Sequence, residues 1–224
     1  MATQAGTLAG TGKYADLKRR LVFLVLALLV YRIGTHVPVP LIDPDQFRQA
    51  FASQQGGILG LLNMFSGGAL SRFSIFSIGI MPYISASIIL QLLTVVWPYL
   101  EKLSKEGDLG RKKITQWTRY GTVVISIVQA LGISFFLEKT SAPGGLALVP
   151  HPGGAFRLLT VLTLTTGCAF VMWLGEQITE RGVGNGISLI IFAGIVVGLP
   201  RAILNTFEDL RTGAMSIITA LLFI

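Results

Sequence analysis

Side chains that could perform acid–base or nucleophilic chemistry are few in this sequence and lie far apart. The two histidines, His36 and His151, lie in loops or at the end of an apolar segment, and no pair of carboxylates lies inside such a segment. A hydrolase acting inside a membrane would need a nucleophile beside a general base, and an ion-coupled carrier would need carboxylates or histidines at membrane depth. The phosphate-binding pattern G-x-x-x-x-G-K-[ST] is absent from the sequence. The sequence therefore predicts a protein that is not an enzyme and has no catalytic residues.

The single cysteine, Cys168, offers little chemistry. One cysteine excludes a disulfide within the chain and a multi-cysteine metal site. Because Cys168 lies inside an apolar run, we expect it to be a small buried hydrophobe. We expect no metal site and no cofactor.

The composition is that of an all-α integral membrane protein. Of the 224 residues, 52% are hydrophobic and 13% are charged, against about 25% charged in soluble domains, and the mean hydropathy is +0.68. The formal net charge is +7, but the basic residues cluster in particular loops and are not interleaved with aromatic residues. The charge therefore indicates membrane topology, and we expect no specific nucleic-acid recognition.

Five apolar segments have the length, or nearly the length, needed to cross a membrane. A helix needs about 20 apolar residues to span a bilayer core of about 30 Å. The segments are residues 21–37, 73–97, 120–137, 158–175 and 187–199, and a sixth apolar run begins at residue 214 and reaches residue 224. Residues 140–156 contain several prolines and glycines, which would interrupt a helix and leave backbone groups unpaired in lipid. We therefore expect a loop there. Arg32, near the end of the first span, is expected to extend outward to the membrane surface.

The distribution of lysine and arginine predicts the orientation of these spans. The densest basic clusters lie at 18–20 and 111–113, and such clusters favour the cytoplasmic side. We therefore expect a cytoplasmic tail at 1–20, a five-span unit at 21–200, and an outer loop with a truncated sixth span at 201–224. A second unit with the same odd number of spans would enter the membrane inverted, as in channels and transporters built from inverted repeats.

One apolar stretch, Ile58–Phe65, is too short to cross. As a helix it would be about 12 Å long, and glycine pairs stand at both of its ends, at 56–57 and 67–68. Glycine supplies the unusual dihedral angles that a chain reversal needs. A re-entrant element buried in the protein fits best, and an interfacial helix lying on the bilayer is the alternative.

Four long motifs make a family resemblance specific: MFSGGALSR, GIMPYISASI, QLLTVV and MWLGEQITERGVGNGISLIIFAG. They closely resemble the SecY family, whose members are the main subunit of the bacterial protein-conducting channel. The resemblance runs from about residue 17 to 200 and on into the sixth apolar run. It implies one half of an inverted-repeat clamshell that surrounds an hourglass pore, with five transmembrane helices, the start of a sixth and a re-entrant plug helix.

The resemblance also implies roles for individual residues. A plug at about 58–71 closes the outer funnel, and it contains Ile58, Leu61, Leu62, Met64, Phe65, Ser66, Gly67, Gly68, Ala69, Leu70 and Ser71. Polar positions of a lateral gate match Ser85 and Gln129, and the isoleucine ring of the pore matches Ile80, Ile84, Ile187 and Ile191. Counted down helices that end at Phe73 and Pro200, these isoleucines lie about 10–20 Å deep, near the midplane of the bilayer core.

The implied function is passage of unfolded secretory polypeptides across the bacterial inner membrane and sideways release of membrane segments into lipid. The implied partners are the SecE and SecG subunits, the motor ATPase SecA, the ribosome with its nascent chain, signal peptides and membrane lipid. The basic loop at 101–119 has a simpler explanation in membrane topology, with SecA contact as the alternative that the resemblance adds.

Overall fold

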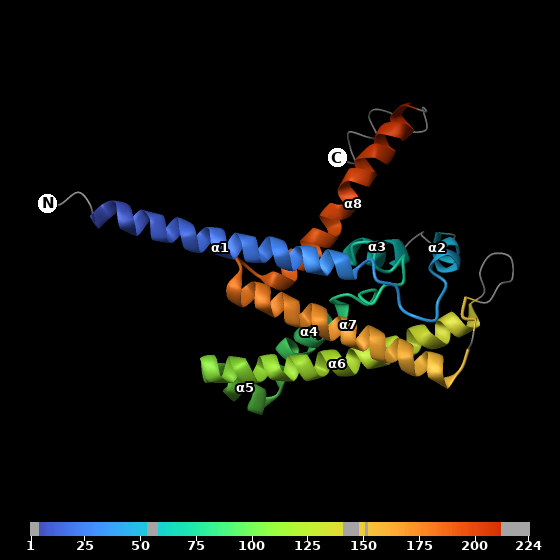
Figure 1. Cartoon of the computed structure of the whole chain (residues 1–224). Coiled ribbons are helices and arrows are strands. Elements are labelled where there is room, and N and C mark those ends of the chain that lie inside the picture. Colours follow the sequence, from blue (N-terminus) through green and yellow to red (C-terminus); the bar gives the residue numbers. More distant parts are fainter. Residues whose placement is uncertain (1–4, 53–57, 141–147, 151, 212–224) are drawn as a thin grey trace.

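The computed structural model describes residues 5–52, 58–140, 148–150 and 152–211, and this part of the chain is helical with connecting loops (Figure 1). The helices are α1 (Ala5–Gly34), α2 (Pro44–Ala52), α3 (Ile58–Phe65), α4 (Met81–Val96), α5 (Pro98–Lys105), α6 (Asp108–Lys139), α7 (Gly154–Arg181) and α8 (Gly186–Arg211). An isolated antiparallel bridge joins Pro38 to Ser74. The predicted all-α class is confirmed in this described part.

Helices α6 and α7 lie side by side and are each long and apolar enough to cross a membrane. The buried face of α6 carries small side chains every four residues, at Thr118, Thr122, Ser126, Ala130 and Ser134. Small residues at this spacing let neighbouring helices approach closely. The buried hydroxyl groups of this stripe donate to carbonyls of their own helix, as Thr122 does to Thr118 O at 2.8 Å, so they need no partner on another helix.

The second predicted span begins later than the hydropathy indicates. Helix α4 begins at Met81, with Pro82 in its first turn, and not at Phe73. Phe73 has a positive φ of 43° and Gly79 has a φ of 62°, so residues 73–80 form an irregular segment. Helix α5 follows α4 with a bend of 99°, and the two together could form a third span. The depth estimate that counted residues down a helix from Phe73 is therefore wrong for Ile80 and Ile84.

The first and fifth predicted spans correspond to parts of α1 and α8. Among the described residues, α6 and α7 pass the length and hydropathy test for a span, the α4–α5 pair is a third candidate, and Gly186–Pro200 is a shorter apolar helix. Helix α8 continues through Pro200 to Arg211, beyond the predicted end at residue 199, and projects away from α1, α6 and α7 in Figure 1. The expected sixth run lies outside the described residues, as do residues 141–147 and 151 of the predicted loop at 140–156.

Two apolar cores hold the helices together. One contains Ala27 and Tyr31 of α1, Val171, Leu174 and Ile178 of α7, and Ile190 of α8. The other joins α2 and Phe73 to the C-terminal end of α6 and the N-terminal end of α7 through residues such as Phe47, Leu137 and Phe156. Helix α2 is amphipathic, and its buried residues are Phe47, Ala50 and Phe51.

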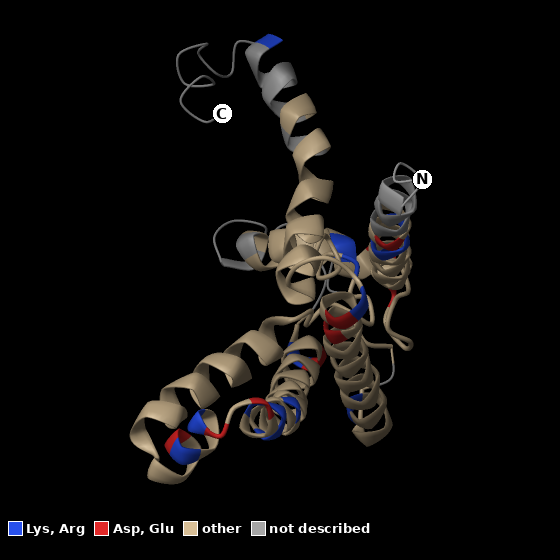
Figure 2. Ribbon diagram, turned by 90° about the vertical axis from the view of Figure 1, so that its left-hand side faces the viewer, with Lys and Arg blue, Asp and Glu red and all other residues tan. Residues whose placement is uncertain are grey.

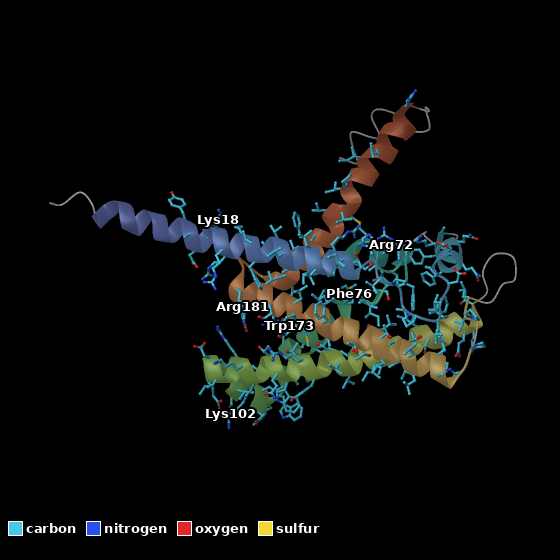
Figure 3. All side chains as sticks on the ribbon, in the orientation of Figure 1. Lys18, Arg72, Phe76, Lys102, Trp173 and Arg181 are labelled. Atoms are coloured by element: carbon cyan, nitrogen blue, oxygen red, sulfur yellow. The ribbon has the colours of Figure 1, made fainter. Side chains whose placement is uncertain are left out.

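Charged residues lie mostly towards the ends of the helices, and the middle portions are largely uncharged (Figure 2). In Figure 3, Lys18, Lys102 and Arg181 lie at one end of the helical group, and Arg72 lies towards the other. This arrangement agrees with the predicted orientation, in which Lys18, Lys102 and Arg181 face the cytoplasm.

Candidate functional site

Helix α3 has the bounds that the apolar run Ile58–Phe65 predicts, and it ends in a reversal at Gly67 and Gly68. These two glycines have φ angles of 64° and 80°, which glycine adopts at little cost. The amide of Gly68 donates to Asn63 O at 2.9 Å, and the amide of Ser71 donates to Asn63 Oδ1 at 2.9 Å. Asn63 therefore ties α3 to the chain that returns from it.

The irregular segment before α4 is anchored by the aromatic ring of Phe76. This ring stacks between Tyr31 of α1, with centroids 5.9 Å apart, and Phe170 of α7, at 5.8 Å. Gly34 and Gly167 lie directly against the same segment, and a Cβ on Gly167 would collide with the carbonyl oxygen of Ile75. The close packing fixes the path of residues 75–80, which leads into α4.

A cavity of about 650 Å³ lies where α3, the irregular segment, α4, α6 and α8 meet. Its lining includes Leu62 and Phe65 of α3, Ile84 and Ser85 of α4, Gln129 of α6, Ile191 of α8 and Ile80 just before α4. The described lining contains no charged side chain. The cavity is thus a mainly apolar space with a few hydroxyl and amide groups.

The structure brings together most of the residues that the resemblance selected. Three of the four isoleucines line the cavity, and the fourth, Ile187, packs in the same apolar cluster as Ile80. Both predicted gate residues, Ser85 and Gln129, line it as well.

The predicted plug residues divide into groups. Leu62, Phe65, Ser66 and Leu70 line the cavity, Ala69 is fully buried, and Met64 is 47% exposed. Gly67, Gly68 and Ser71 form the reversal after α3. The side chains of Ile58 and Leu61, and the upstream glycine pair at 56–57, lie outside the described residues.

Two residues of α1 contact this site although the sequence did not select them. The hydroxyl of Tyr31 donates to Ser66 O at 3.4 Å, and Nη1 of Arg32 donates to Gly67 O at 2.8 Å. The expected outward extension of Arg32 is therefore replaced by a contact with the end of α3. The sequence did contain a signal for this contact: Arg32 lies inside an apolar run, and a charged side chain there needs a polar partner.

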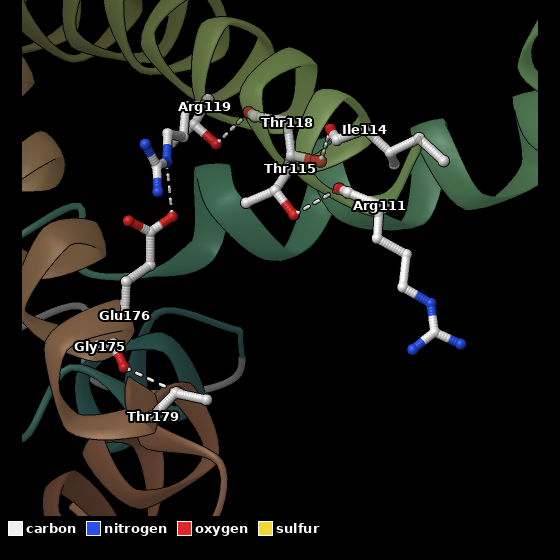
Figure 4. A network of polar contacts seen from close by, with 9 residues as sticks. Arg111, Ile114, Thr115, Thr118, Arg119, Gly175, Glu176 and Thr179 are labelled. Atoms are coloured by element: carbon white, nitrogen blue, oxygen red, sulfur yellow. Dashed lines mark hydrogen bonds and ion pairs between the residues drawn. The ribbon is translucent and has the colours of Figure 1, made fainter. Parts of the chain in front are cut away.

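Two ion pairs join α6 to α7, one near each end. Arg119 Nε lies 2.8 Å from Glu176 Oε1 (Figure 4), and Arg157 Nη2 lies 2.7 Å from Glu138 Oε2. Glu138 also accepts from the amide of Gly153 at 3.1 Å. The α6–α7 pair is thus tied near both ends by charge-assisted hydrogen bonds.

The turn between α7 and α8 is fixed by side-chain hydrogen bonds. Asn185 Oδ1 accepts from the amides of Ile187 and Ser188 at 3.0 and 3.3 Å, so Asn185 is the N-cap of α8. Thr179 Oγ1 accepts from the amide of Gly186 at 2.8 Å. These bonds set the direction in which α8 leaves α7.

Comparison with solved structures defines the class. The fold is similar to Sec61 in a canine ribosome–channel complex from the endoplasmic reticulum and to a structure described as a protein-conducting channel. Each similarity has a TM-score of 0.58 and 18% sequence identity, and covers 90% of this chain and 43% of the other. The protein is therefore an all-helical membrane protein with the SecY/Sec61 fold.

Sequence comparison then gives the family. The SecY family model matches residues 74–224, and the chain belongs to the SecY family. It is 54% identical to the protein translocase subunit SecY of Escherichia coli K12 over 99% of this chain and 50% of that protein. It is 56% identical to that of Pseudomonas aeruginosa over 97% of this chain and 48% of that protein. The chain thus spans about half the length of these relatives, and the expected family is confirmed.

Proposed function

We propose that this chain forms half of the pore subunit of a Sec translocon, which passes unfolded secretory polypeptides across the bacterial inner membrane. Membrane segments leave the pore sideways into lipid through a lateral gate. Two findings support this proposal: the chain belongs to the SecY family, and three of the four ring isoleucines, both gate residues and several plug residues line one cavity. The shared cavity is the observation that carries the proposal.

The apolar lining suits a seal against water and ions. A narrow collar of branched apolar side chains offers water no hydrogen bonds, so it can close by dewetting. Ile80, Ile84 and Ile191 supply such side chains to the cavity, and Ile187 packs against the same apolar cluster as Ile80. Isoleucine side chains also carry no charge, so the lining does not favour polypeptides of one composition over those of another.

The plug is assigned to α3 and its following turn. Leu62 and Phe65 line the same cavity as Ile80, Ile84 and Ile191. A short helix in this position blocks the pore, and the glycines after it allow it to move as a unit. The buried position of the turn, with Ser66 only 6% exposed, favours this assignment over an interfacial helix lying on the bilayer.

The lateral gate is assigned to α4 and α6, which carry Ser85 and Gln129. These helices pack against one another, and a Cβ on Gly121 of α6 would lie 3.5 Å from Ala86 Cβ of α4. In the complete channel the second half supplies the opposite lip of the gate. The five spans predicted from the sequence form one half of the clamshell, with the N-terminus in the cytoplasm.

The energy for transport comes from partners, because the pore itself performs no chemical step. We assign this role to the motor ATPase SecA or to a translating ribosome, and we assign SecE and SecG as companion subunits. Signal peptides and membrane lipid meet at the gate. An ion-coupled carrier would need ionisable groups along its pathway, and the described lining of the cavity has none.

Site-specific photo-crosslinking tests the proposal directly. A photoreactive amino acid replaces Ile84, and a secretory precursor is arrested during transport through the reconstituted channel complex. The matched control carries the probe at Val124, which is 61% exposed on α6. We expect crosslinks to the arrested precursor from position 84 and much weaker ones from position 124. Equal crosslinking from both positions, or none from position 84, would contradict the assigned path.

A further inference from the structure

The turn that follows α3 receives hydrogen bonds from two consecutive residues of α1. Tyr31, which is 4% exposed, donates through its hydroxyl to Ser66 O at 3.4 Å. Arg32 donates through Nη1 to Gly67 O at 2.8 Å and to Thr35 Oγ1 at 3.4 Å. Two successive carbonyls of the turn are therefore bound by one edge of α1.

The carbonyl of Gly67 depends on Arg32 more than the carbonyl of Ser66 depends on Tyr31, because Ser66 O also accepts from the amide of Ala69 within the turn at 3.3 Å. The last carbonyls of a helix have no partner within it, and an unpaired carbonyl in a buried position is costly. Ser66 and Gly67 are both buried. A guanidinium makes a stronger hydrogen bond than a neutral donor does, so Arg32 is the main tie at this point.

Helix α8 also packs against this turn. A Cβ on Gly194 would lie 2.8 Å from Phe65 O and 3.2 Å from the amide nitrogen of Gly67. The backbones of α8 and the turn are thus in direct contact, which only glycine at position 194 allows. One helical turn further along α8, a Cβ on Gly198 would meet nothing within 4 Å.

We propose that Arg32 is a positioning residue that latches the plug in its closed place, with Gly194 as the surface against which the latch holds it. This inference rests on the proposed function of α3 as the plug. When α3 leaves the cavity, the bond from Arg32 to Gly67 O breaks, so the strength of this bond sets how often the resting channel is open.

Arg32→Met and Arg32→Lys test the latch in the reconstituted channel complex. Both are made in a Cys168→Ala background with Leu62→Cys, which leaves one thiol in this chain, on the cavity face of α3. The two measurements are the ion conductance of proteoliposomes at rest and the rate at which a water-soluble maleimide labels position 62. We expect Arg32→Met to raise both by about tenfold or more, as loss of a hydrogen bond to a charged group predicts.

The lysine variant separates latching from a general structural role. Lysine keeps the charge and can donate to the same carbonyl, so we expect smaller rises than with methionine. Gly194→Ala should raise both quantities by displacing the turn, and Gly198→Ala is the matched control that should change neither. Because Gly194→Ala leaves α1 unaltered, it tests the latch even if Arg32→Met does not fold.

Three outcomes would overturn the latch: unchanged conductance and labelling in Arg32→Met, equal effects of methionine and lysine, or equal effects of Gly194→Ala and Gly198→Ala. A ring variant, Ile84→Ser with Ile191→Ser, is measured in parallel. If the ring variant leaks and Arg32→Met does not, the latch is wrong and the proposed function stands. If the ring variant does not leak, the proposed seal itself is wrong.

Discussion

Replacing Gly167 with alanine should wedge α7 away from the irregular segment that leads into α4. A Cβ at this position would collide with the carbonyl oxygen of Ile75, would lie 2.9 Å from its carbonyl carbon, and would lie 3.3 Å from Cδ1 of Phe76. A backbone carbonyl cannot rotate aside as a flexible side chain can. The Phe76 ring is also held between Tyr31 and Phe170, so the segment has little room to retreat.

The size of the effect follows from two opposing terms. Adding a methyl group to a well-packed site costs about 1–3 kcal/mol, and the upper end applies because the obstacle is backbone. Alanine in place of glycine inside a helix gains about 1 kcal/mol. We therefore expect Gly167→Ala to lower the free energy of unfolding by about 2 kcal/mol.

Gly132→Ala is the matched control, because a Cβ on Gly132 of α6 would meet nothing within 4 Å. It should keep or slightly raise stability, so the two variants should differ by about 2–3 kcal/mol. The measurement is denaturant-induced unfolding of the purified protein in detergent, followed by tryptophan fluorescence. If Gly167→Ala is as stable as Gly132→Ala, the close contact between α7 and Ile75 is not present.

Three further predictions concern the N-cap of α8, the carboxylate of Glu138 and the orientation of the chain in the membrane. Asn185→Ala should lower the unfolding free energy by about 1 kcal/mol through loss of the cap, Asn185→Asp should largely retain it, and equal losses from both would contradict the capping role. Glu138→Gln should speed hydrogen exchange at the amide of Gly153, which donates to this carboxylate; unchanged exchange would show that the bond is not formed. Cysteine at Ser104, in a Cys168→Ala background, should react with an impermeant maleimide only from the cytoplasmic face, and cysteine at Arg48 only from the outer face; the reverse pattern would invert the predicted topology.

Local signals in the sequence predicted several features correctly. The bounds of α3 follow from a mostly apolar run of eight residues between glycine pairs. The membrane class and the SecY family follow from composition and from long motifs. These features depend on residues close together in the chain, which is why the sequence reveals them.

Features that depend on distant contacts could not be predicted. Residues 73–80 are as apolar as a span, but their backbone bonds go to the chain after α1, with Val39 N donating to Phe73 O at 2.9 Å. Hydropathy does not report such a partner, so α4 was expected to start too early. Arg32 similarly binds a carbonyl 35 residues away, and no periodicity in the sequence connects the two positions.

In the proposed function, an uncharged isoleucine lining holds back water and ions at rest. The most direct test of this seal is the resting ion conductance of the reconstituted channel carrying Ile84→Ser together with Ile191→Ser. Ile89→Ser, at a position 49% exposed on the same helix as Ile84, is the control for a serine outside the cavity. We predict that the double variant conducts ions well above the unmutated channel and the control. Conductance equal to that of the unmutated channel would contradict the account.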